Sequence, residues 1–156
     1  MKLGVSVLFS LIGSVAMAMP CADLNGTWVV KAGQPSGCMR GDLVINQKDC
    51  NVFDIEGSFF KAGYVTSEEV ENGADFPLKR VRQTTWNSDK QILQIDEILT
   101  QVAKDSQSSY LAKYFGTLKF KDAQTLVIVS EYNLVSMNSG MRDSKNYSRT
   151  CEMKRK

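Results

Sequence analysis

The sequence predicts an all-β fold of about eight antiparallel strands, and three observations support it. A Gly-x-Trp step from Gly26 to Trp28 opens directly into the β-branched pair Val29-Val30. Residues 52–57 alternate apolar and acidic side chains with a period of two, as a half-buried antiparallel strand does. Residues 110–120 place Tyr, Ala, Gly, Leu and Phe side chains on one face, and the run Leu-Val-Ile-Val at 126–129 is the strongest strand signal.

The first half of the chain reads as strands separated by turns. The first strand is predicted to end near residue 32, and a glycine-rich loop at 33–37 separates it from a strand at 43–45. A turn at 48–51 leads into the strand at 52–57, where Gly57 is interpreted as a bulge before Phe59 and Phe60. Residues 66–77 are polar and acidic and predict a surface loop, and residues 78–86 predict a further strand.

Residues 87–102 fit two structures. Apolar residues recur there at the helical positions 92, 95, 99 and 102, and Ser88 with Gln91 resembles a capping box, so a short helix near 89–102 is one alternative. Strand structure is favoured because the segment continues through a polar stretch at 104–109 into the alternating run at 110–120. A turn at 121–124, a loop at 136–144 and a last strand at 147–153 complete the prediction.

The first eighteen residues predict a signal peptide. Lys2 gives a positive start, residues 3–15 are mainly apolar, and Ala16-Met17-Ala18 forms a cleavage site. The apolar run is shorter than the roughly 20 residues of a spanning helix, so we expect no membrane span. The sequence therefore predicts an exported protein, periplasmic or secreted, with one domain at 19–156.

Charge and residue types exclude several classes of function. Without the leader the chain has 18 basic and 17 acidic residues, a balance that argues against a nucleic-acid partner. The chain has no histidine, which excludes a Ser-His-Asp triad, a Cys-His pair and histidine-ligated metal or haem. We therefore expect no enzymatic activity, no metal and no cofactor, in a protein that is a monomer.

Four cysteines, Cys21, Cys38, Cys50 and Cys151, all follow the leader. An even number in an exported chain predicts two disulfides, and no pair has the CxxC spacing of a redox or zinc motif. In a strand meander, Cys38 lies at the opposite end from the other three, so some segment must fold back to reach it. We expect the N-terminal segment to do so, which gives the pairs Cys21–Cys38 and Cys50–Cys151.

The leader, the Gly26-x-Trp28 step, the antiparallel strands and a basic residue on the last strand together resemble a small secreted bacterial lipocalin-like (calycin-type) protein. The resemblance implies an up-and-down β-barrel in which Arg149 packs across Trp28 to close one end. As motif it rests on Gly26, Trp28 and Arg149 alone, and the chain is shorter than a typical lipocalin.

An eight-stranded barrel either packs its interior solid or holds one small ligand. The expected function is therefore binding of a small hydrophobic molecule inside the barrel. The alternatives are a protein-binding module, such as an inhibitor of an exported hydrolase that uses loops 33–41 and 66–77, or an envelope protein with a packed barrel and no ligand. The side chains predicted to face the interior are Trp28, Val30, Ile45, Phe53, Ile55, Leu118, Phe120, Leu126, Ile128 and Tyr132.

Overall fold

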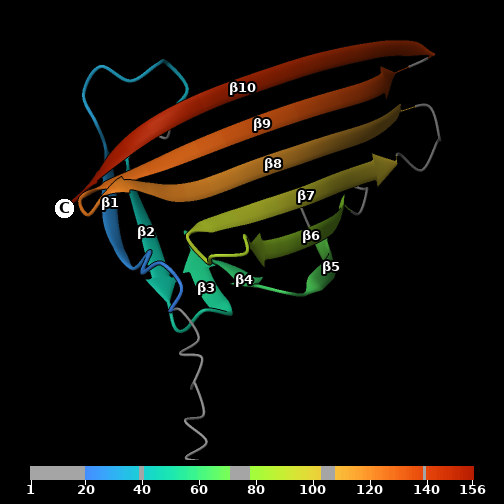
Figure 1. Cartoon of the computed structure of the whole chain (residues 1–156). Helices are drawn as coiled ribbons and strands as arrows, with labels where there is room; N and C mark the ends of the chain where they lie inside the picture. The colour runs from blue at the N-terminus through green and yellow to red at the C-terminus, as the bar shows by residue number, and fades with distance from the viewer. Residues whose placement is uncertain (1–19, 39–40, 71–77, 103–107, 139) are drawn as a thin grey trace, which may run out of the picture.

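Ten antiparallel strands form one continuous sheet in the computed structural model, which describes residues 20–38, 41–70, 78–102, 108–138 and 140–156 (Figure 1). The signal peptide predicted at 1–18 lies outside the described residues. The strands are β1 (Gly26–Val30), β2 (Asp42–Gln47), β3 (Val52–Ile55), β4 (Ser58–Lys61), β5 (Val65–Val70), β6 (Leu78–Trp86), β7 (Ile92–Val102), β8 (Ser108–Asp122), β9 (Thr125–Asn138) and β10 (Met141–Arg155).

The sheet curls into a nearly closed barrel. Its strand order is β4-β3-β2-β1-β10-β9-β8-β7-β6-β5, so the last strand of the chain lies beside the first. At the other seam β4 approaches β6, where Ala62 forms a bridge with Thr84 and the Gly63 N–H donates to the Thr84 carbonyl at 2.8 Å. The all-β class is confirmed, and no segment among the described residues forms a helix long and apolar enough to cross a membrane.

Two strands that the sequence pattern did not predict raise the count from eight to ten. The predicted bulge at Gly57 is a hairpin turn between β3 and β4, with Ile55 paired to Ser58. Glu56 and Gly57 both have positive φ, 54° and 75°, as a tight two-residue hairpin turn requires. Part of the loop predicted at 66–77 is strand β5, paired with β6, whereas residues 71–77 lie outside the described residues.

Residues 92–102 form strand β7, so the helical alternative for 89–102 is wrong. The residues read as a capping box belong to a turn instead. The side-chain carbonyl of Asn87 accepts hydrogen bonds from the N–H groups of Gln91 (2.9 Å) and Ile92 (2.8 Å). A side chain that satisfies two backbone donors in this way stabilises a turn just as well as a helix start.

The last three strands are longer than predicted, with 15, 14 and 15 residues in β8, β9 and β10. Most of the loop predicted at 136–144 is strand, because β9 continues to Asn138 and β10 begins at Met141. Residues 141–150 are exposed on both faces, so they show no apolar alternation that could reveal a strand. Together with β7, these strands extend past β1–β4 as a projecting arm (residues 96–102, 108–115, 131–138 and 140–149; Figure 1).

The barrel core is packed by large apolar side chains, of which Trp28, Phe53 and Leu93 have no exposed surface. Aromatic rings meet there at tilted angles, with centroids 5.6 Å apart for Trp28–Phe120 and 5.7 Å for Phe53–Trp86. The buried indole N–H of Trp28 donates to the Leu24 carbonyl at 3.1 Å, which satisfies the one polar group of that ring.

The cation over Trp28 is Arg155, which corrects the prediction that Arg149 takes this place. The Arg155 Cζ lies 4.7 Å from the Trp28 ring centroid, and the two residues are register partners on β10 and β1. Arg149 shares the inner face with Arg155 but lies six residues earlier, where its guanidinium donates to the Gly37 carbonyl. The closed end of the barrel is therefore nearer to the C-terminus than the sequence pattern indicated.

Two disulfides are present as predicted, but their pairing is Cys21–Cys50 and Cys38–Cys151. The predicted pairs are wrong because a different segment folds back. The N-terminal segment stays near the end of β2, where the Leu24 N–H donates to the Gln47 side chain at 2.7 Å. The loop after β1 instead returns along β10, and the Gln34 side chain accepts from the Glu152 N–H at 2.9 Å. Two disulfides fit an oxidising, extracytoplasmic environment.

Candidate binding face of the arm

Nine of the ten residues predicted to face a ligand cavity belong to the packed core. Trp28, Ile45, Phe53, Leu118 and Leu126 are buried within it, while Val30, Ile55, Phe120 and Ile128 are partly buried and pack against it. The tenth, Tyr132, lies beyond the core on the arm, where it lines a groove. These nine side chains lie in the core or against it, and ligand binding by any of the ten stays a prediction.

The inner face of the arm carries four of the chain's five tyrosines, Tyr110, Tyr114, Tyr132 and Tyr147, here called the tyrosine face. Side chains alternate between the two faces of a strand, and each tyrosine lies an even number of residues from a core residue on its own strand. The four tyrosines are therefore on the face of the sheet that covers the core in the closed part of the barrel. Tyr114, Tyr132 and Tyr147 are direct neighbours across β8, β9 and β10. The tyrosine face therefore continues the core surface outward, past the closed part of the barrel.

The tyrosines contact one another. The hydroxyl oxygens of Tyr110 and Tyr132 are 2.6 Å apart, and the ring centroids of Tyr132 and Tyr147 are 6.3 Å apart. Tyr114 lies over Gly116, where a Cβ would be only 2.6 Å from the tyrosine oxygen, so the missing side chain lets the ring lie against the sheet. Tyr110, Tyr132 and Tyr147 are thereby linked through hydroxyl and ring contacts.

Two hydroxyls of this face, those of Tyr114 and Tyr132, have a raised pKa. Burial, followed by the hydrogen bond between its hydroxyl and that of Tyr110, raises the pKa of Tyr132 to about 12. Burial is also the main cause that raises the pKa of Tyr114, with the negative charge of Glu97 adding to it. Protonated phenols both donate and accept hydrogen bonds, so the face offers aromatic surface together with polar groups.

A groove of about 710 Å³ crosses the arm at the level of Tyr132. Each of the strands β7 to β10 contributes three consecutive residues to its lining. They are Asp96, Glu97, Ile98, Lys113, Tyr114, Phe115, Glu131, Tyr132, Asn133, Asn146, Tyr147 and Ser148. A second hollow of about 290 Å³ lies near the tip and is lined by Gln101, Ser108, Ser109, Tyr110, Ser136, Met137 and Asn138. Both combine aromatic or apolar surface with amide, hydroxyl or charged groups.

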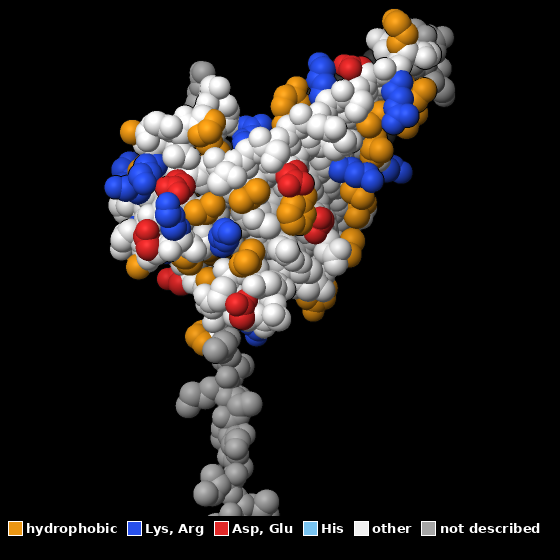
Figure 2. Space-filling view, turned by 45° about the horizontal axis from the view of Figure 1, so that its top comes forward, with side chains coloured by type: hydrophobic (Ala, Val, Ile, Leu, Met, Phe, Trp, Pro, Cys, Tyr) orange, Lys and Arg blue, Asp and Glu red, His pale blue; other side chains and the backbone are white. Residues whose placement is uncertain are grey.

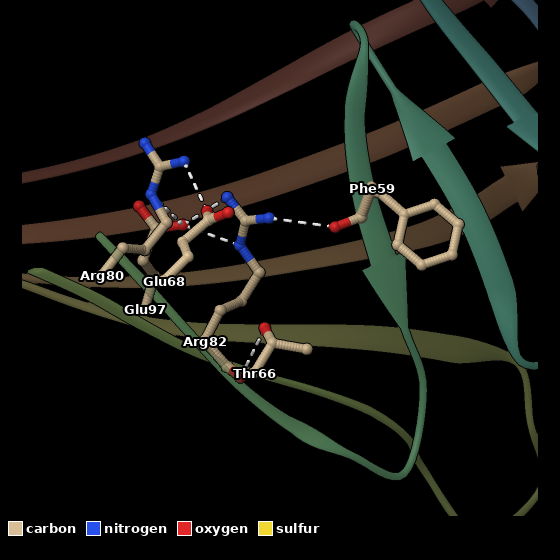
Figure 3. A network of polar contacts seen from close by, with 6 residues as sticks. All are labelled: Phe59, Thr66, Glu68, Arg80, Arg82 and Glu97. Carbon is tan, nitrogen blue, oxygen red and sulfur yellow. Dashed lines mark hydrogen bonds and ion pairs between the residues drawn. The ribbon is translucent and has the colours of Figure 1, made fainter. Parts of the chain in front are cut away.

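A buried ion pair joins the base of the arm to the seam of the barrel (Figure 3). The Arg82 Nη2 and the Glu97 carboxylate are 2.7 Å apart, and both side chains are mostly buried. The same guanidinium donates to the Phe59 carbonyl at 3.2 Å and lies 4.1 Å from the centroid of the Phe60 ring. Arg82 on β6 therefore holds β4 in place and closes the barrel where the strands themselves barely pair.

The ion pair extends toward the edge strand β5. Arg80 Nη1 lies 3.0 Å from the Glu68 carboxylate, and its Nε lies 3.6 Å from that of Glu97 (Figure 3). Charges of both signs are thus matched along this flank of the inner face. Each guanidinium in this network lies beside a carboxylate, so no charge is left unpaired to act as an acid or base. We interpret the network as a structural link across the seam of the barrel.

The described residues include no group of three or more carboxylate or cysteine side chains that could hold a metal ion. What the face does offer is rigid tyrosine rings, which give large amphipathic contact area at a low entropic cost. The sequence contained part of this signal, since the alternation at 110–120 put Tyr110 and Tyr114 on one face. The strand predicted at 147–153 begins at Tyr147, but the sequence did not place that residue beside the other tyrosines.

Comparison of the chain with protein-family models, with curated proteins and with solved structures finds no match. The nearly closed antiparallel barrel is compatible with a lipocalin-like fold.

Proposed function

We propose that this is an exported, non-enzymatic binding protein that docks a segment of another protein on the tyrosine face of its arm. The observation that carries the proposal is the gathering of Tyr110, Tyr114, Tyr132 and Tyr147 on one surface, which begins at the packed core with Tyr114 and continues outward along the arm. Tyrosine is enriched in the energetically dominant parts of protein interfaces. In this proposal the scaffold is a lipocalin-like barrel, residues 1–18 direct export, and the disulfides stabilise the mature protein outside the cytoplasm.

Exposed apolar side chains lie on both faces of the arm. Met141, which is 76% exposed, adds apolar surface to the tyrosine face, since it lies an even number of residues from the core residue Met153 on β10. Ile98, Val102 and Met137, which are between 41% and 60% exposed, lie on the opposite face. Figure 2 shows apolar side chains continuing along the projecting part, with Lys and Arg side chains between them.

A small apolar ligand is the second candidate, and one observation favours it. The groove volume of about 710 Å³ falls within the roughly 300–1,000 Å³ of small-molecule sites. In that case the ligand occupies the groove beside Tyr132 rather than the barrel interior, which its own side chains fill.

Site-specific photo-crosslinking tests the first candidate. A photoreactive phenylalanine analogue at Tyr147, which is 50% exposed, is expected to trap one discrete protein from the cell envelope. Tyr64 is 55% exposed and lies outside the arm, so the same analogue there is the matched control and should trap nothing comparable. A Tyr132→Ala change should abolish the trapping at position 147. Equal trapping at both positions, or none at position 147, contradicts the proposal.

A further inference from the structure

Strand β10 has an open edge along the arm. β1 pairs with β10 only at residues 153–155, and the next residues of the β1 loop hold Glu152, whose carbonyl accepts from the Lys31 N–H at 3.0 Å. Since Glu152 points its backbone groups away from β9, strand alternation makes Arg142, Ser144, Asn146 and Ser148 do the same. Within the described residues no strand other than β9 pairs with β10 between residues 141 and 148, and all of those side chains are exposed.

From this edge we infer that two copies of the chain pair through antiparallel β10 strands, with Asn146 on the two-fold axis, to form one sheet across both. The argument is self-complementarity, which a two-fold interface requires. In this register the backbone groups of Ser144, Asn146 and Ser148 meet those of Ser148, Asn146 and Ser144 of the second copy. An exposed edge with its hydrogen-bonding groups unpaired is a template for such pairing.

The side chains on the inner face also match in this register. Asp143 lies opposite Arg149 of the second copy, and by symmetry the same ion pair forms twice. Lys145 lies opposite Tyr147 of the second copy, where an ammonium group can approach an aromatic ring. Asp143 and Lys145 already lie on one face, since their charged groups are 3.6 Å apart within one copy. Moving the axis to Lys145 would place two ammonium groups against each other.

The length of the open edge agrees with the register. The edge ends near Thr150, whose carbonyl is 3.9 Å from the Cys38 Sγ of the loop that folds back. Pairing centred on Asn146 needs backbone groups only from Ser144 to Ser148. From Met141 on, the second copy's hairpin has to turn away from the sheet, because the loop joined to Cys151 by Cys38 occupies the edge there. The inference does not rest on the proposed function, but its consequence would be to join the tyrosine faces of two copies into one larger surface.

Charge reversal tests the pairing in the oxidised mature protein by analytical ultracentrifugation. The native protein is expected to be dimeric, and Asp143→Arg or Arg149→Asp alone should each weaken the dimer at least tenfold. Mixing the two single variants should restore dimers. In a dimer of unlike chains the introduced arginine faces the introduced aspartate, and the other contact keeps the native pair of Asp143 with Arg149. The double variant should also dimerise by itself.

Asn146→Pro tests the backbone pairing separately. Proline removes an N–H that points to the open edge, so circular dichroism and thermal unfolding should be unchanged while the dimer is lost. Asn146→Ala keeps the N–H and is the matched control. A native protein that stays monomeric at high micromolar concentration and low salt overturns the inference. A dimer that survives Asn146→Pro, or one that responds to the proline but not to Arg149→Asp, overturns the assigned edge or register.

Discussion

The guanidinium of Arg155 lies over the indole ring of Trp28, with its Cζ 4.7 Å from the ring centroid. Arg155 also donates to the Asp23 carbonyl at 3.1 Å. The end of the last strand is thereby fastened to both the first strand and the segment that precedes it. This contact, together with the pairing of Trp28 with Arg155 across β1 and β10, closes the meander.

Removing either partner of this contact should destabilise the protein by different amounts. Arg155→Ala should lower the free energy of unfolding by about 1–2 kcal/mol, the value of a partly desolvated cation–π contact. Trp28→Ala should cost about 3–5 kcal/mol, because it also leaves a cavity in the core. Lys154→Ala, which removes an exposed side chain of the same strand, is the control, with an expected change of at most about 0.5 kcal/mol, and Arg149→Ala should cost less than Arg155→Ala. Denaturant midpoints with the disulfides intact measure all four, and a larger effect at Arg149 than at Arg155 would refute this assignment.

The buried pair between Arg82 and Glu97 should be costly to break from one side. Glu97→Gln leaves the Arg82 guanidinium, whose side chain is only 8% exposed, without its carboxylate, and should cost about 3–5 kcal/mol. The double change Arg82→Met with Glu97→Met should cost less than Glu97→Gln alone, since no buried charge is left unpaired. Chemical denaturation of both variants measures the difference.

The exposed pair between Lys79 and Glu69 provides the control for that experiment. Their side chains are 64% and 67% exposed and their charged groups are 3.6 Å apart. Glu69→Gln should therefore change the free energy of unfolding by no more than about 1 kcal/mol. If Glu69→Gln and Glu97→Gln have the same effect, the seam of the barrel does not depend on Arg82.

Much of the fold could be predicted because a half-buried strand shows alternation in its sequence. The runs at 52–57 and 110–120 gave the correct strands, and the inward faces assigned from Trp28 to Ile128 are in the core. The prediction failed where a strand has water on both faces, as at residues 141–146 of β10. It also failed at Glu56-Gly57, because a positive φ at a glutamate is not visible from residue type.

The candidate site was harder to predict than the core for a related reason. Which segment folds back cannot be determined from strand order alone, so the loop that brings Cys38 to Cys151 was not anticipated. The same limit applied to Arg149 and Arg155, which are both basic and share one strand face. Only the register between β1 and β10 distinguishes them, and register depends on contacts that are far apart in the sequence.

The two disulfides should differ in what they contribute. Cys38–Cys151 closes a sequence separation of 113 residues, worth about 4.8 kcal/mol in the chain-entropy model, and Cys21–Cys50 one of 29 residues, worth about 3.6 kcal/mol. Cys38→Ser with Cys151→Ser should therefore lower the thermal midpoint more than Cys21→Ser with Cys50→Ser. Peptide mapping without reduction checks the pairing directly, and recovery of a Cys21–Cys38 peptide would contradict it.

The tyrosine face should show itself in an alkaline titration. Because burial and the Tyr110 hydroxyl raise the pKa of Tyr132 from 10.0 to about 12, the folded state holds this proton more tightly than the unfolded state does. The resulting stabilisation is complete below pH 10 and is lost as the pH rises toward about 12. The ultraviolet absorbance of tyrosinate should therefore include a late step that Tyr132→Phe removes and that Tyr110→Phe moves to lower pH. Tyr64→Phe, which changes an exposed ring outside the arm, should leave that step in place. If Tyr132→Phe also leaves the late step unchanged, the contact between Tyr110 and Tyr132 does not form as described, and the ordered tyrosine face loses its main support.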